Sequence, residues 1–144
     1  VVMDKIVVDS SVAIKWFIPQ DYSSEANKIL NSYQQGQVIL LAPDLIYAEV
    51  GNIIWKMERF QGLESVDAQA VLDLFEQMQF NIVTSKQLLK SAYRFATNHQ
   101  RSVYDSLYVV LSIRENCKFV TADSKLYNAV CKQVKNIRLV QNWS

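Results

Sequence analysis

The sequence contains little glycine, proline, cysteine or histidine, and each shortage excludes a class of protein. Three glycines and two prolines among 144 residues exclude a collagen-like repeat and a flexible Gly- or Pro-rich linker. Two cysteines, Cys117 and Cys131, stand in no CxxC or Cys/His spacing, which favours free thiols over a disulfide framework or a zinc site. A single histidine, His99, excludes mechanisms that need two histidines on one chain.

An excess of charge of one sign and long apolar runs are also lacking. Fifteen Lys and Arg residues balance fourteen Asp and Glu residues, so the formal net charge of +1 gives no general sign of a nucleic-acid or membrane partner. No run approaches the roughly eighteen apolar residues of a membrane-spanning helix, and a signal-peptide pattern is absent. We therefore expect a cytoplasmic protein, on which any surface that binds polyanions is local.

The composition is typical of one folded domain, because half of the residues are hydrophobic and a fifth are charged. Continuous apolar segments alternate with helical patterns, which predicts parallel strands that are buried on both faces. The segments are Lys5 to Val8, Val38 to Leu41, Phe80 to Val83, Phe119 to Thr121 and Ile137 to Val140. We expect a single α/β domain over residues 1–144, built as a three-layer α/β/α sandwich around a mostly parallel sheet of four to five strands. Between strands, Pro43 is expected in the first turn of a helix that ends near Phe60.

The first strand runs directly into an acidic residue. In the segment IVVDSSVAIKW, Asp9 follows three β-branched apolar residues and precedes two serines and a helical pattern. Ligand sites in parallel sheets lie at the carboxyl ends of the strands, which makes Asp9 a candidate ligand. An Asp in this place is as often the N-cap of the next helix, where it stabilises by about 1 kcal/mol. A ligand-binding Asp9 would leave the capping to Ser10 or Ser11.

Three further acidic residues occupy comparable places. Asp123 follows the strand-like segment KFVTAD, and Asp105 is the one charge in the first turn of a helix that is apolar on nearly every face. Glu49 lies on the polar stripe of a helix, with Asn52, Lys56 and Arg59, opposite the apolar stripe Ile46, Val50, Ile53 and Met57. Each residue alone has an ordinary explanation: capping or the helix dipole for the two Asp residues, and a solvated helix face for Glu49.

Four motifs in order resemble those of the PIN-domain family, particularly its VapC-type toxins. The motifs are VVDSSVAIKWF, PDLIYAEVGNIIWK, VYDSLYVVLS and FVTADSKLYNAV, and the resemblance spans the chain from about Ile6 to Val140. Each motif is weakly specific, whereas all four in this order and spacing are strongly specific. The resemblance implies a PIN-like fold and places the acidic positions of the family on Asp9, Glu49, Asp105 and Asp123. Thr121 stands at the hydroxyl position of a T-x-D turn, and Ser10 and Asn52 stand where relatives are often polar.

The resemblance implies a metal-dependent endoribonuclease whose cleavage of RNA leaves a 5′-phosphate and a 3′-hydroxyl. Carboxylates without a neighbouring Cys or His suit Mg²⁺ or Mn²⁺ rather than zinc. We expect Asp9 and Asp105 to bind the metal most directly, with Asp123 and Glu49 completing the set directly or through water. Ser10, Thr121 and Asn52 are expected to orient these ligands by hydrogen bonds. Contacts with RNA phosphates would fall to cations near the motifs, of which Lys15, Lys56, Arg59, Arg101 and Lys125 are candidates and none stands out.

The resemblance also implies partners. VapC-type toxins are held inactive by a small VapB-like antitoxin and commonly form homodimers. Aromatic residues that would suit an antitoxin groove or a dimer surface are Trp16, Phe17, Tyr47, Trp55 and Phe60, although burial within one chain explains them equally well.

Other functions stay open. A PIN nuclease that processes RNA without being a toxin, and a non-catalytic PIN-like interaction module, both agree with the motifs. A phosphatase of the DxD type would need a second Asp where Ser11 stands. A receiver domain would need an acidic pair and a late Lys that the sequence does not offer.

Overall fold

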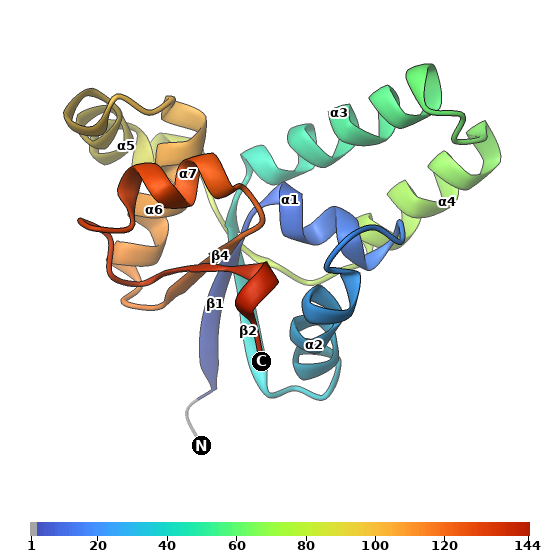
Figure 1. Ribbon diagram of the computed structural model, residues 1–144, viewed down its shortest axis with the longest axis horizontal. Coiled ribbons are helices and arrows are strands. Elements are labelled where there is room, and N and C mark those ends of the chain that lie inside the picture. Colours follow the sequence, from blue (N-terminus) through green and yellow to red (C-terminus); the bar gives the residue numbers. More distant parts are fainter. Residues whose placement is uncertain (1–2) are drawn as a thin grey trace.

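Five parallel strands form the central sheet of the computed structural model, which describes residues 3–144 (Figure 1). They lie in the order β3-β2-β1-β4-β5, and each neighbouring pair is parallel. Their bounds are β1 Asp4–Val8, β2 Val38–Pro43, β3 Asn81–Val83, β4 Lys118–Thr121 and β5 Ile137–Leu139. The prediction of an α/β sandwich with a parallel sheet is therefore confirmed.

Helices cover both faces of the sheet, on opposite sides of it in Figure 1. One face carries α1 (Ser10–Ala13), the 3₁₀ helix η1 (Ile14–Trp16), α2 (Ser23–Gln34), α3 (Leu45–Phe60) and α4 (Ser65–Glu76). The other carries α5 (Ser85–His99), α6 (Val103–Arg114) and α7 (Ser124–Val130), and a final 3₁₀ helix, η2 (Val140–Asn142), follows β5. The pair α3 and α4 extends away from the sheet, at the upper right of Figure 1.

The order of the strands creates a switch point between β1 and β4. From β1 the chain moves to β2 on one side, and from β4 it moves to β5 on the other. Val8 pairs with Val120, so the residues that follow these two strands emerge side by side at the carboxyl edge of the sheet. Open parallel sheets bind ligands at such a point because the connections there leave in opposite directions.

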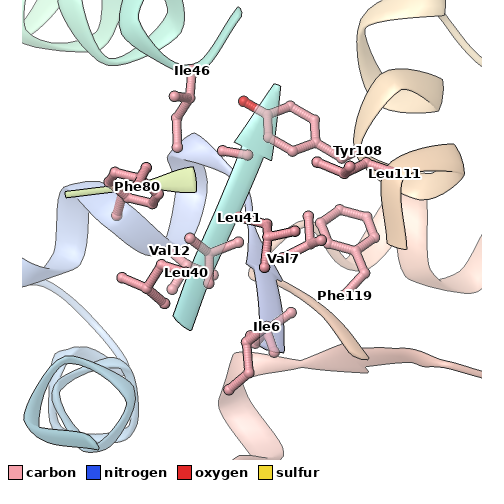
Figure 2. Close-up of a cluster of buried hydrophobic side chains, with 14 of the residues drawn as sticks. Ile6, Val7, Val12, Leu40, Leu41, Ile46, Phe80, Tyr108, Leu111 and Phe119 are labelled. Atoms are coloured by element: carbon pink, nitrogen blue, oxygen red, sulfur yellow. The ribbon is translucent and has the colours of Figure 1, made fainter. Parts of the chain in front are cut away.

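The core lies on both faces of the sheet, and one part of it fills the space between the sheet and α6. Val7 and Val8 of β1 and Phe119 of β4 have no exposed surface, and residues 106–112 of α6 are all buried. Figure 2 shows how Tyr108, Leu111 and Phe119 gather against the central strands. The helix is apolar on nearly every face because α5 covers the side that the sheet leaves open.

Two details of the helix that was predicted to run from Pro43 to near Phe60 differ from the structure. Pro43 is the last residue of β2, not part of a first helical turn, and it pairs with Val83. It lies beyond the last pair between β1 and β2, Val7 with Leu41, so its missing N–H costs no bond in that ladder. The buried stripe of α3 includes Ile54, whereas Ile53 and Met57 are only partly buried. None of the helices within the described residues has the length and apolarity that a membrane crossing requires.

Candidate active site

Asp9 lies at the carboxyl end of β1 and is 8% exposed. Its Oδ1 accepts hydrogen bonds from the backbone N–H of Ser11 (3.1 Å) and of Val12 (3.4 Å), so Asp9 caps α1. Its Oδ2 accepts a hydrogen bond from Thr121 Oγ1 at 2.5 Å. The expectation that a serine would cap the helix in place of Asp9 was wrong, because the two carboxylate oxygens serve different partners.

The buried position changes the acidity of Asp9. Burial raises the pKa of this carboxyl from 3.8 to about 6, even though hydrogen bonds from Ser11 and Thr121 lower it, and the charge of Glu49 adds to the rise. Ionisation of Asp9 therefore costs free energy in the metal-free protein. A cation beside Asp9 would stabilise the ionised form.

Two hydroxyl groups join the end of β1 to the turn after β4. Ser11 Oγ donates to Asp9 Oδ1 at 2.5 Å and accepts the backbone N–H of Ala122 at 2.9 Å. Thr121 Oγ1, besides its bond to Asp9, accepts the backbone N–H of Asp123 at 3.1 Å. These bonds fix the Asp9 carboxylate from both sides and hold the Asp123 turn next to it.

Glu49 reaches the same edge of the sheet from α3. Its half-buried carboxylate receives two hydrogen bonds on Oε1, from Tyr108 OH at 2.5 Å and from Ser10 Oγ at 3.3 Å. Burial raises the pKa of Glu49, the two hydroxyl donors lower it, and the charge of Asp105 raises it further. Glu49 is therefore a fixed acidic group in the cluster, and not the solvated residue that its helix pattern alone would favour.

Asp105 and Asp123 complete the group. Asp105 lies in the first turn of α6, half-buried, and Ser102 is the N-cap that accepts its backbone N–H at 3.0 Å. Burial and then the charge of Asp123 raise the pKa of Asp105. Asp123 is exposed and caps α7, since its Oδ1 accepts the N–H of Leu126 at 3.1 Å. The fold thus brings the four predicted acidic residues together, each within electrostatic reach of the next.

The remaining predicted residues lie in different surroundings. Ser10 contacts Glu49 rather than Asp9. Asn52 is exposed on α3, and no hydrogen bond joins it to Glu49 within the described residues. The structure therefore gives Asn52 no contact with the carboxylates.

The candidate phosphate contacts also separate into groups. Lys15 is half-buried and donates to Gln20 Oε1 at 3.3 Å, so it faces its own loop. Lys56, Arg59 and Lys125 are exposed, and the Arg59 guanidinium lies 5.4 Å from the ring centroid of Phe60. A fifth cation, Arg101, stands close enough to the cluster for its charge to lower the pKa of Asp105.

Two residues of the cluster, Ser11 and Tyr108, were not predicted from the sequence. Ser11 lies two residues after Asp9, just beyond the end of β1, and Thr121 ends the neighbouring strand β4. Their contact could be predicted only by knowing that β1 lies beside β4. Tyr108 follows Asp105 by three residues, a helical spacing that puts both on one face of α6. Burial, and next the charge of Glu49, raise the pKa of Tyr108 well above its usual range, so its hydroxyl stays protonated and donates a hydrogen bond to Glu49.

The donor set suits a hard divalent cation, although it is not assembled into a coordination shell. Glu49 Oε2 and Asp123 Oδ2 accept no hydrogen bond from any described residue, which leaves them free as ligands. Within residues 3–144, no three His, Cys, Asp or Glu side chains converge closely enough to hold a metal ion in their present positions. Mg²⁺ keeps several waters in its shell, so a cluster of this kind fits an ion that is bound partly through water.

A cavity elsewhere in the molecule does not compete for this role. It has a volume of about 710 Å³ and lies at the amino ends of the strands, where Lys5, Val38 and Lys118 line it. Lys5 and Glu115 form an ion pair of 3.2 Å in its wall. The carboxylate cluster stands at the opposite, carboxyl end of the sheet, where parallel sheets bind their ligands.

Known proteins share both the sequence pattern and the fold. The sequence model of the PIN domain matches residues 6–131. Ribonuclease VapC3 of Pyrobaculum aerophilum is 30% identical over 124 residues, which cover 85% of this chain and 92% of that protein.

Solved structures give the same result for the fold. PAE2754 from Pyrobaculum aerophilum has a TM-score of 0.66 and 20% identity, covering 97% of this chain and 93% of its own. VapBC2 from Rickettsia felis, bound to a DNA fragment from its promoter, has a TM-score of 0.60 and 15% identity (94% and 96% covered). VapC20 of Mycobacterium tuberculosis, a toxin that cleaves the sarcin-ricin loop, has a TM-score of 0.63 and 14% identity (86% and 94% covered). The resemblance that the four motifs suggested is confirmed, and this chain belongs to the PIN domain family.

Proposed function

We propose that this chain is an endoribonuclease that hydrolyses RNA phosphodiester bonds with the help of Mg²⁺ or Mn²⁺. The observation that carries the proposal is the grouping of Asp9, Glu49, Asp105 and Asp123, from four separate elements, at the carboxyl ends of β1 and β4. The 30% identity to a ribonuclease over most of the chain supports RNA as the substrate. We take residues 1–144 to act as one nuclease domain.

The side chains have separate tasks in this proposal. Asp9 and Asp105 would hold the ion most directly, and Glu49 and Asp123 would complete its surroundings through their free oxygens or through water. A divalent cation held there would lower the pKa of a water molecule, orient the phosphate and stabilise charge that develops on its oxygens. The hydroxyl groups of Ser11 and Thr121 donate to Asp9 and are not free to attack, so water is the nucleophile. The products would then carry a 5′-phosphate and a 3′-hydroxyl.

Contact with the RNA backbone falls to Arg101 in this proposal. Its charge reaches Asp105, whereas Lys15 is turned toward Gln20 and the other candidate cations are exposed without a contact to the cluster. A guanidinium beside the carboxylates can hold a phosphate oxygen and keep the acidic edge from repelling the RNA.

We further propose that the protein is the toxin of a type II toxin–antitoxin pair, acting in the cytoplasm. The relative VapC3 and the fold neighbour VapBC2 carry the names of such systems. A small VapB-like antitoxin and a second copy of the chain would be its partners. Trp55 and Phe60 are exposed on α3 and can meet a partner, whereas Trp16 and Phe17 pack against Phe80 and Phe75 inside the chain.

The test of the nuclease proposal is metal-dependent cleavage of a panel of RNAs. We expect cleavage with Mn²⁺ or Mg²⁺, none with excess EDTA, and none by Asp9→Asn or Asp105→Asn protein with an unchanged circular dichroism spectrum. Asp73→Asn, an exposed change on α4, serves as the matched control and should cleave like the wild type. An identical RNA profile for wild type and Asp9→Asn would favour the non-catalytic interaction module.

A second experiment separates a toxin from an RNA-processing enzyme. Expression of the toxin should arrest growth, and co-expression of the small open reading frame adjacent to its gene should relieve the arrest. Ribonuclease activity without toxicity would assign the chain to RNA processing.

A further inference from the structure

Tyr108 connects the apolar core to the carboxylate cluster. The residue is 2% exposed, and its ring stacks on that of Phe119, with centroids 5.9 Å apart and ring planes at 8°. Only the hydroxyl points out of the core, and in Figure 2 it lies beside the end of β2. It donates a hydrogen bond to Glu49 Oε1 at 2.5 Å. The donor therefore stands on a rigid support that packing keeps in place.

The hydroxyl of Tyr108 lies near more than one acidic residue. Tyr108 lies one helical turn after Asp105 on α6, and Asp9, Glu49 and Asp105 are all within electrostatic reach of its oxygen. Glu49 comes from a different helix, α3, and its long side chain has several rotatable bonds that need a partner to fix them. Ser10 supplies a second donor to the same oxygen, but at 3.3 Å and from a part-buried position.

We propose that Tyr108 is a positioning residue for Glu49. By fixing Oε1, the phenol hydroxyl leaves Oε2, which accepts no hydrogen bond from a described residue, available to the ion that the proposed function places among the carboxylates. Tyr108 touches neither the ion nor the RNA and acts only through Glu49. Groups that orient a metal ligand in this way typically contribute about 10- to 100-fold in metal affinity or activity. The inference rests on the proposed metal site.

A purely structural role would look different. A buried Tyr hydroxyl needs a hydrogen-bond partner, and Glu49 would then serve only to satisfy it. Removal of the hydroxyl would in that case change the stability of the protein and leave its affinity for a metal ion unaltered. Metal affinity in two backgrounds separates the two roles.

The experiment is calorimetric titration of Mn²⁺ into wild type, Tyr108→Phe, Glu49→Gln and the double variant. Tyr108→Phe keeps the ring on Phe119 and should weaken Mn²⁺ binding by about tenfold or more in the wild-type background. In the Glu49→Gln background the same change should weaken binding by less than about twofold, because the group that it positions is already lost. Tyr104→Phe, an exposed change on the same helix, is the matched control and should bind like the wild type.

Cleavage kinetics give a second measurement. At saturating Mn²⁺, Tyr108→Phe should lower kcat and leave KM for RNA unchanged, since the phenol contacts no substrate. Unchanged Mn²⁺ affinity in Tyr108→Phe, or an equal loss in both backgrounds, would overturn the inference while the nuclease proposal stands. Failure of the wild type to bind Mn²⁺ would overturn both, and this outcome is distinguishable because it needs no variant.

Discussion

The hydroxyl of Thr121 donates a hydrogen bond of 2.5 Å to Asp9 Oδ2, and this bond joins the end of β4 to the residue after β1. The preceding residues of the two strands, Val8 and Val120, are partners in the sheet. Thr121 has no exposed surface and Asp9 is 8% exposed, so the bond is largely shielded from solvent. The same hydroxyl accepts a hydrogen bond from the N–H of Asp123 and thus holds two of the four acidic residues next to each other.

Replacement of Thr121 by Val should therefore weaken both the fold and the site. Val keeps the shape of Thr but leaves the buried Asp9 Oδ2 and the N–H of Asp123 without their partner. We expect a loss of about 1–3 kcal/mol in the free energy of unfolding, measured with urea, and weaker Mn²⁺ binding by calorimetry. Thr121→Ser retains the hydroxyl and should keep most of the metal affinity. Wild-type stability and affinity in Thr121→Val would show that this bond orients nothing.

The two serines after Asp9 should respond differently to substitution. Ser11 Oγ donates to Asp9 and accepts from Ala122, whereas Ser10 Oγ makes one longer contact, to Glu49. Ser11→Ala should cost about 1–3 kcal/mol of unfolding free energy, and Ser10→Ala less than about 1 kcal/mol. Urea unfolding of the two variants side by side tests this order, and a larger loss for Ser10→Ala would contradict it.

The acidity of Asp9 makes the stability of the metal-free protein depend on pH. Its pKa is raised from 3.8 to about 6, so between these pH values the folded state binds more protons than the unfolded state. Stability is then highest below that window and falls as the pH rises through it. The contribution of Asp9 should fall by about 2 kcal/mol between about pH 4.5 and pH 7.5.

Comparison with Asp9→Asn isolates this contribution. The Asn side chain does not titrate, so the difference in unfolding free energy between wild type and variant, measured with a chelator present, should shift against the wild type as the pH rises. Saturating Mn²⁺ at pH 7.5 should restore the wild type and affect the variant less, because a ligand stabilises the state that binds it. A difference that stays constant with pH would show that burial does not raise the pKa of Asp9.

Much of this arrangement could be predicted from the sequence because it depends on local patterns. Continuous apolar runs predicted the parallel strands, and the acidic residue after each of two such runs predicted which strand ends would carry the site. The prediction failed where the answer depends on which strands are neighbours. Nothing local says that β1 lies beside β4, and for that reason Ser11 was predicted as a possible cap and not as a bridge to Ala122.

Side chains that extend out of the core posed a second difficulty. Tyr108 lies in an apolar helix whose residues all read as core, and its ring is indeed core. The polar role of the hydroxyl becomes visible only when α3 brings Glu49 to it. The prediction for Pro43 was wrong for a related reason. A proline suits both the end of a strand and the start of a helix, and only the pairing of Pro43 with β3 decides between them.

The aromatic residues on α3 give the last prediction. Trp55 and Phe60 are 56% and 69% exposed, and their rings contact each other edge to face with centroids 5.9 Å apart. Large aromatic side chains at an interface often contribute 2 kcal/mol or more to binding, about a 30-fold change in Kd, whereas exposed residues contribute little to stability. Trp55→Ala should therefore weaken self-association or antitoxin binding by about this factor.

The same variant should change the free energy of unfolding by less than about 1 kcal/mol and leave the specific activity of the unbound enzyme near that of the wild type. Sedimentation measures the self-association, and calorimetry with the proposed antitoxin measures the second interface. Tyr93→Ala is the matched control, because Tyr93 is 61% exposed on α5, on the opposite face of the sheet. If Trp55→Ala and Tyr93→Ala both associate like the wild type, the exposed end of α3 is not a partner surface. If Tyr93→Ala alone fails to associate, the surface lies on α5 instead, and the aromatic pair on α3 serves neither interface.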